Sequence, residues 1–225
     1  MHVAFAQAES APSNGAVAAV AVPAHEGLGI QILRMVGPSE PGPFSQKARL
    51  HRYLQNLAGP VPLLFEATAA ATMLGLDRPP EWGQEASGYF RRFGNDFAFN
   101  GVRSTLSYVT ANLSREDNRY FASGKSGTWA RVTHAMASTV IAHGPNGGER
   151  VSVSAITGVV GASIISRTWL PPSFQGGSSI GRSIAFSFAA EAGFHVFQEF
   201  VPDIIRGLEK PKGRRLPRSG GSATP

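Results

Sequence analysis

Small side chains recur at four-residue intervals in three stretches of this chain, and this spacing limits what those stretches can fold into. Residues four apart lie on one face of an α-helix, so each series predicts a helix with a smooth face. A second backbone can approach such a face closely, which is typical of helices that pack in or near lipid. The predicted packing residues are Ala67, Ala71 and Gly75; Ser154, Gly158, Ala162 and Ser166; and Gly181, Ala185, Ala189 and Gly193.

The composition agrees with close helix packing. Only 16% of the 225 residues are charged, whereas chains that stay disordered are usually rich in charge. The chain contains no cysteine, which excludes disulfides, thiolate nucleophiles and cysteine-ligated zinc or iron–sulfur sites. We therefore expect a mainly α protein, a bundle of about six helices between disordered N- and C-terminal tails.

Breaks in the hydrophobic pattern divide the chain into three parts. Residues 1–43 are rich in Ala, Pro, Gly and Ser and predict a flexible leader, residues 44–208 a helical domain, and residues 209–225 a basic disordered tail. The triplet Ala6-Gln7-Ala8 is similar to a signal-peptide cleavage site. The leader is thus either the remnant of a signal peptide or an ordinary alanine-rich start.

Helical periodicity accounts for most of the central domain. Ser45 is placed to cap the first helix and Thr128 a later one, while Tyr89, Phe90, Phe93 and Phe97 predict an aromatic stripe that leaves Arg91 and Arg92 elsewhere. Val151–Ser154 alternates between apolar and polar residues, which leaves a short strand possible there. The predicted helices cover residues 44–58, 62–76, 84–99, 102–113 after an interruption at Asn100-Gly101, 128–143, 151–166 and 178–200.

Two segments approach the properties of a membrane span. Residues 151–166 carry no charge but are fewer than the roughly 20 residues that a spanning helix needs. Residues 178–200 are long enough but contain Glu191 and Glu199, and a charge at mid-bilayer costs about 2.5–3.5 kcal/mol. Spanning helices and a compact bundle attached to a membrane remain open alternatives.

One polar stripe has the residue types of a metal site. Glu191, His195 and Glu199 stand four residues apart, so one helix face would present two carboxylates and an imidazole. These three residues are the candidate metal ligands, and the alternative is a polar stripe whose members bond one another. The sequence predicts no catalytic or cofactor-binding residue and no cofactor.

Two further motifs favour structural interpretations. Gly177-Ser178-Ser179-Ile180-Gly181 has the form of a hydrolase nucleophile elbow, but that motif needs a preceding strand, and a serine that caps a helix explains the residues better. Within Glu116-Asp117-Asn118-Arg119-Tyr120-Phe121, we expect Asp117 and Arg119 to pair locally.

The charge distribution suggests possible partners. The net charge is +6, and much of the excess lies in the tail, at Lys210, Lys212, Arg214, Arg215 and Arg218. Such a tail either keeps a protein soluble or binds anionic lipid or nucleic acid. Because no nucleic-acid motif accompanies it, nucleic acid is an unlikely partner by this reasoning, and a small-molecule ligand stays undetermined.

Several short motifs together resemble an uncharacterised family of exported bacterial proteins found in acidobacteria-type genomes. The resemblance covers roughly residues 44–206 and implies an exported, envelope-associated helical protein without an established activity. The chain departs from that family at Ser166–Pro171, where an Asn-Leu-Tyr-Tyr-Pro-like stretch is usual. The motifs are Glu81-Trp82-Gly83-Gln84, Gly88-Tyr89, Arg92-Phe93-Gly94, Glu116-Asp117-x-Arg119-Tyr120-Phe121 and Glu199-Phe200-x-Pro202-Asp203-Ile204.

These observations favour a non-enzymatic helical protein of the bacterial envelope, in the periplasm or attached to a membrane. It would pack or self-associate through small-residue helix faces, with membrane or envelope components and further copies of itself as partners. Two alternatives stay open: a soluble metal-binding protein or enzyme that uses the Glu191, His195 and Glu199 stripe, and an adaptor that binds anionic lipid or nucleic acid through its basic tail.

Overall fold

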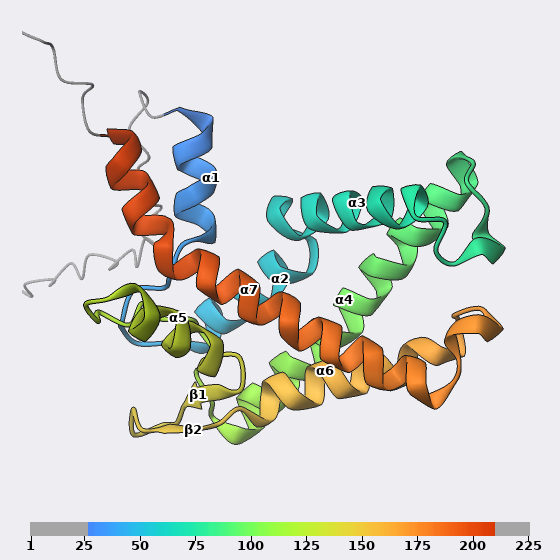
Figure 1. The fold of residues 1–225 in the computed structure, drawn as a ribbon. Coiled ribbons are helices and arrows are strands. Elements are labelled where there is room, and N and C mark those ends of the chain that lie inside the picture. The colour runs from blue at the N-terminus through green and yellow to red at the C-terminus, as the bar shows by residue number, and fades with distance from the viewer. Residues whose placement is uncertain (1–26, 210–225) are drawn as a thin grey trace, which may run out of the picture.

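The computed structural model describes residues 27–209, which form seven α-helices and one two-stranded hairpin (Figure 1). The predicted mainly helical fold class is confirmed. The cleavage-like triplet at residues 6–8 and the basic residues from Lys210 onward lie outside the described residues. The helices are α1 (Leu28–Val36), α2 (Gln46–Ala58), α3 (Pro60–Gly75), α4 (Ala86–Ser114), α5 (Thr128–Ala137), α6 (Val153–Ile165) and α7 (Gly177–Glu209), and the strands are β1 (Ile141–His143) and β2 (Glu149–Val151).

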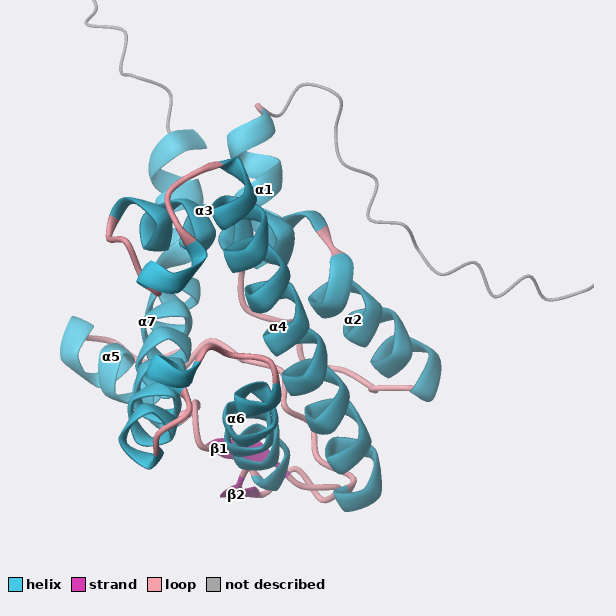
Figure 2. Cartoon of the chain, turned by 90° about the vertical axis from the view of Figure 1, so that its right-hand side faces the viewer, coloured by secondary structure: helices cyan, strands magenta, loops and turns pink. Residues whose placement is uncertain are grey.

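Helix α4 is the central element, and α2, α3 and α6 all pack against it (Figures 1 and 2). The break predicted at Asn100-Gly101 is wrong, because α4 runs without interruption for 29 residues. Both residues serve the contact with α2 instead. The Asn100 side-chain amide donates to the Asn56 carbonyl over 2.9 Å, and Leu57 of α2 lies beside Gly101.

The helix predicted over residues 128–143 is wrong beyond Ala137. The chain turns there into β1, which pairs antiparallel with β2 through the glycine-rich turn at residues 144–148. The predicted cap is also displaced by one residue, since Gly127 is the N-cap of α5 and Thr128 its first residue. By contrast, Ser45 caps α2 as predicted, with its hydroxyl accepting from the Ala48 amide.

A buried carboxylate determines where α6 begins. Glu116 is 0% exposed and accepts the backbone amides of Val153 and Ser154 over 3.1 and 2.9 Å. An anion at a helix N-terminus satisfies amides that have no partner within the helix. Burial opposes the charge of Glu116, but these hydrogen bonds outweigh burial and hold its pKa below the ordinary value. Directly after Glu116, Asp117 forms the predicted local pair with Arg119 at 2.7 Å.

Part of the predicted flexible leader is ordered and packed. Residues 28–36 form α1, which lies along the C-terminal part of α7 (Figure 1). The side-chain amide of Gln198 donates to the Val36 carbonyl over 2.8 Å, and the Ser39 amide donates to the Tyr120 carbonyl over 2.8 Å. The leader prediction is therefore wrong for this part of the chain.

Helix α7 is longer than predicted at both ends and continues through Pro202 to Glu209. The residues of the formal nucleophile elbow form its first turns, where Ser179 is buried. No strand precedes them, because Pro172–Phe174 is a short 3₁₀ turn. The elbow geometry that a hydrolase needs is thus not present at this motif.

Candidate functional site

The exposed face of α3 is apolar over the whole helix. Leu64 and Phe65 leave 62% and 57% of their surface exposed, and Leu76, the residue that caps the end of α3, leaves 60% exposed. Among the described residues, one helical stretch is long and apolar enough to cross a membrane, Gln46–Gly75, with a mean hydropathy of 1.4 and only 11% of its apolar window buried. Its basic residues lie in α2, and the one acidic residue of α3, Glu66, is buried, so α3 supplies the exposed apolar part. Apolar surface of this extent usually marks an interaction site.

The two hydroxyl groups on this face form hydrogen bonds within the helix rather than with water. Thr68 donates its hydroxyl to the Leu64 carbonyl, and Thr72 donates to the Thr68 carbonyl, each over 2.8 Å. Both threonines are exposed, so their methyl groups complete the surface between the large apolar side chains. A face whose polar groups are all satisfied within the helix is compatible with a hydrocarbon environment.

The opposite face of α3 packs against α4. Ala70 is fully buried there, and the Tyr89 hydroxyl of α4 donates to the Ala67 carbonyl over 3.4 Å. At the N-terminal end of α3, the ring of Phe65 meets Phe194 of α7 edge to face, with centroids 5.7 Å apart. Helix α3 is therefore supported from behind by α4, and of the large apolar side chains on its outer face Phe65 also contacts α7.

A carboxyl group lies in the seam between α3 and α4. Glu66 is only 7% exposed, and neither of its carboxyl oxygens has a hydrogen-bond partner among the described residues. Burial raises the pKa of Glu66, and the neighbouring Asn100 amide offsets this only in part because it donates to Asn56. On α4, burial raises the pKa of Asp96 to about 6. A hydrogen bond from the Asn95 side-chain amide opposes this rise, and the charge of Glu66 adds to it.

A buried arginine fixes the connection between these two helices. Arg92 is 1% exposed and donates to the carbonyls of Arg78, Pro79 and Gly83 over 2.8, 2.9 and 2.6 Å. The connection closes so tightly around it that a Cβ at Gly88 would collide with the Gly83 carbonyl. No sequence pattern predicted this burial, because the aromatic stripe prediction left Arg92 out. The stripe prediction included Phe90, which is 67% exposed.

The predicted metal ligands do not converge. Glu191 pairs with Arg103 of α4 at 2.9 Å, and His195 stacks on Tyr120 with ring centroids 4.8 Å apart. Glu199 lies one turn further along and is 1% exposed. Across residues 27–209, no group of three His, Asp or Glu side chains is arranged to hold a metal ion. Glu191 pairs with α4, whereas His195 and Glu199 both contact Tyr120, so the three side chains do not share one metal position, which corrects the metal-site hypothesis.

Glu199 is instead the centre of a structural network. It accepts hydrogen bonds from the Tyr120 hydroxyl, from the backbone and hydroxyl of Ser123, and from the Arg131 guanidinium. Burial raises the pKa of Glu199, but these bonds outweigh it and hold the pKa below its ordinary value. Arg131 also reaches Asp203 over 2.6 Å. The network ties α5 and the loop before it to α7.

The three small-residue series occupy different environments. Ser154, Gly158, Ala162 and Ser166 are all buried, and a Cβ at Gly158 would collide with Ser107 of α4 and lie 3.0 Å from the Arg103 carbonyl. In α3, Ala67 is half-buried, whereas Ala71 and Gly75 are exposed and Ala70 is the residue in the contact. The α7 series is exposed on a face that no described helix covers: Gly181, Ala185, Ala189 and Gly193.

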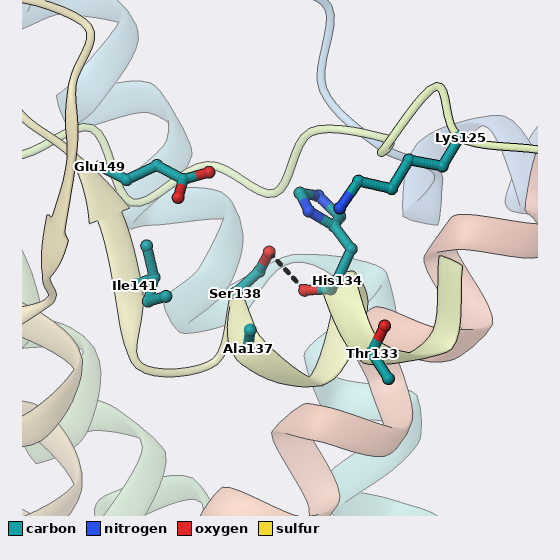
Figure 3. A pocket seen from close by; sticks show the side chains of 7 residues that line it. All are labelled: Lys125, Thr133, His134, Ala137, Ser138, Ile141 and Glu149. Atoms are coloured by element: carbon teal, nitrogen blue, oxygen red, sulfur yellow. Dashed lines mark hydrogen bonds between the residues drawn. The ribbon is translucent and has the colours of Figure 1, made fainter. Parts of the chain in front are cut away.

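The polar hollow in Figure 3 lies beside α5 and the hairpin and has a volume of about 200 Å³. Lys125 and His134 stand on one side of it and Glu149 on the other, while the Ser138 hydroxyl donates to the His134 carbonyl over 2.9 Å. Lys125 and Glu149 are both exposed, and no buried polar group points into the hollow. Its geometry does not define a ligand.

The described residues thus define a helical protein with an unpartnered apolar face on α3. Comparisons with known protein families, curated proteins and solved structures find no match. The resemblance to exported envelope proteins, and the location and partners it implies, stay predictions.

Proposed function

We propose that this chain is a non-enzymatic, membrane-associated helical protein that lays the exposed face of α3 into the surface of a lipid bilayer. One observation carries the proposal. The whole outer face of α3 is apolar, and its two exposed threonines return their hydroxyl groups to the helix backbone. Transfer of such a face from water to lipid is favourable, and it leaves no polar side chain of the face without a hydrogen bond.

The length of α3 favours lying in the interface over spanning. Its 16 residues measure about 24 Å as a helix, less than the roughly 30 Å of a bilayer core. Lipid also fits the charge of the chain better than a second copy does, because a net charge of +6 is attracted to anionic leaflets and opposes self-association. The envelope location expected from the sequence is a compatible extension of this proposal.

A vesicle flotation assay tests the proposal with the double variant Leu64→Gln and Leu76→Gln. Both side chains are more than half exposed, so the substitutions leave the fold intact. Burying a leucine stabilises by about 1.5–3 kcal/mol, so the double variant loses at least about tenfold in partitioning into vesicles of phosphatidylcholine and phosphatidylserine.

Leu113→Gln is the matched control, because Leu113 is 81% exposed but lies at the far end of α4. It keeps wild-type partitioning. If wild-type protein stays with the soluble fraction, or if the α3 double variant partitions like Leu113→Gln, the proposal is wrong. Loss of a dimer in the double variant without any vesicle binding would assign the face to a second copy instead.

A further inference from the structure

The carboxyl group of Glu66 lies on the buried side of α3, behind the face that we assign to lipid, and it is close enough to Asp96 of α4 for the two charges to interact. Glu66 is the only ionisable residue of α3, and it points into the seam with α4, where neither carboxyl oxygen finds a donor. A buried carboxylate without partners is costly, whereas the protonated acid is not. The free energy of this seam therefore depends on whether its carboxyl groups are ionised or protonated.

Resting on the proposed membrane binding, we propose that the Glu66 and Asp96 pair makes this binding acid-dependent. When α3 settles into the bilayer surface, hydrocarbon replaces water along one side of the seam and weakens the remaining solvation of both carboxyl groups. Neutral carboxyl groups tolerate this change and carboxylates do not. Binding then takes up protons, and acid strengthens it.

No basic group offsets this pair. From α4, the groups that face Glu66 are the Asp96 carboxyl and the Asn100 amide, and those that act on Asp96 are Asn95 and Glu66 itself. Among the described residues, neither Glu66 nor Asp96 forms an ion pair with a basic side chain. Tyr89 of α4, the remaining titratable neighbour, donates its hydroxyl to the Ala67 carbonyl.

Proton uptake sets the size and sign of the effect. Binding that takes up one proton strengthens by about tenfold for each pH unit between the pKa values of the free and the bound protein. The pKa of Asp96 is raised to about 6 in the free protein, and loss of water on binding raises it further. Partitioning therefore increases as the pH falls from about 7.5 to about 5.5.

The test measures flotation with phosphatidylcholine vesicles across this range. These vesicles carry no net charge, so protonation of the histidines does not contribute to binding by attraction to anionic lipid. Wild-type protein gains about tenfold or more in partitioning between about pH 7.5 and about pH 5.5. The double variant Glu66→Gln and Asp96→Asn cannot ionise, and it binds at both pH values as wild type does in acid.

Glu149→Gln removes an exposed carboxylate of β2, far from the seam, and keeps the wild-type pH dependence. Circular dichroism at both pH values confirms that each variant is folded. A pH dependence that survives in the Glu66→Gln and Asp96→Asn variant overturns the inference, as does wild-type binding that is constant with pH. If wild type and the neutral double variant both fail to bind these vesicles at any pH, and also fail to bind vesicles that contain phosphatidylserine, the proposed membrane binding itself is wrong.

Discussion

At the scale of single residues, the fold buries charge and satisfies it in most places. Arg92 finds three carbonyls, Glu116 finds two backbone amides, and Glu199 finds a tyrosine, a serine and an arginine. Glu66 differs, because its oxygens are buried and have no partner among the described residues. A buried polar group without partners usually has a reason in function or in strain.

Asp96→Asn tests the cost of charge in this seam for the protein free in solution. The pKa of Asp96 rises from 3.8 in the unfolded chain to about 6 in the folded protein. The fold therefore loses stability as the pH rises between these two pKa values. The variant removes this penalty and keeps an oxygen that accepts from Asn95. At neutral pH we expect it to be more stable by about 1–2 kcal/mol, after discounting for partial exposure.

Urea unfolding at about pH 4.5 and about pH 7 measures this effect as a difference between variant and wild type. The difference cancels contributions of opposite sign, such as those of Glu199 and of His195, whose pKa burial lowers. The stabilisation by Asp96→Asn is small at the lower pH. An equal gain at both pH values would show that the charge of Asp96 is not the cause.

At the scale of elements, the α4 and α6 contact is the closest helix packing that the small-residue series produce. The Ser107 hydroxyl donates to the Ser154 carbonyl over 3.0 Å across this contact, and Gly158 leaves room for the approach. The four-residue spacing predicted this face from the sequence, because it depends only on the period of the helix. It did not distinguish α6 from α7, since spacing says nothing about which face meets a neighbour.

Gly158→Ala and Gly181→Ala form a matched pair that separates packing from helix propensity. At Gly158 the added methyl group collides with α4, and overpacking of this kind costs about 1–3 kcal/mol. At Gly181 no atom lies within 4 Å, so the same change stabilises by about 0.5–1 kcal/mol through backbone entropy. Thermal unfolding measures both shifts, and a fall in melting temperature for Gly181→Ala would show that its face is covered.

Other elements were predictable only in part, for local reasons. Ser45 predicts the start of α2 because its hydroxyl accepts a hydrogen bond from the backbone amide three residues away. Asn100-Gly101 looks like a turn in sequence, yet the contact with α2 keeps both residues helical. The burial of Arg92 and Glu66 depends on how α3 folds back on α4. No periodicity within one segment contains that information.

At the scale of the whole molecule, contacts are unevenly distributed. The α4 and α6 seam and the Glu199 network hold one part together from several sides, whereas α3 is supported from behind and open in front. Elements with few buried apolar contacts open more easily than the rest of a fold. The surface that we assign to lipid therefore belongs to the less protected part of the molecule.

Hydrogen exchange measures this difference directly. We expect the amides of α6 to exchange at least about tenfold more slowly than those of α3, because tenfold corresponds to about 1.4 kcal/mol of local opening energy. Adding vesicles slows exchange in α3 and leaves α6 unchanged. Equal protection of the two helices, or protection by lipid that appears in α6 alone, would contradict this view of the molecule.

The packing of α1 against the end of α7 also has a topological consequence. Arg34 and Glu209 meet at 3.0 Å, so the chain enters and leaves the described fold at the same end. The 26 residues before Gly27 and the 16 residues after Glu209 thus join the described fold at neighbouring positions. A short peptide would suffice to join them, which makes this fold suited to circular permutation, with new termini opened in the turn between β1 and β2.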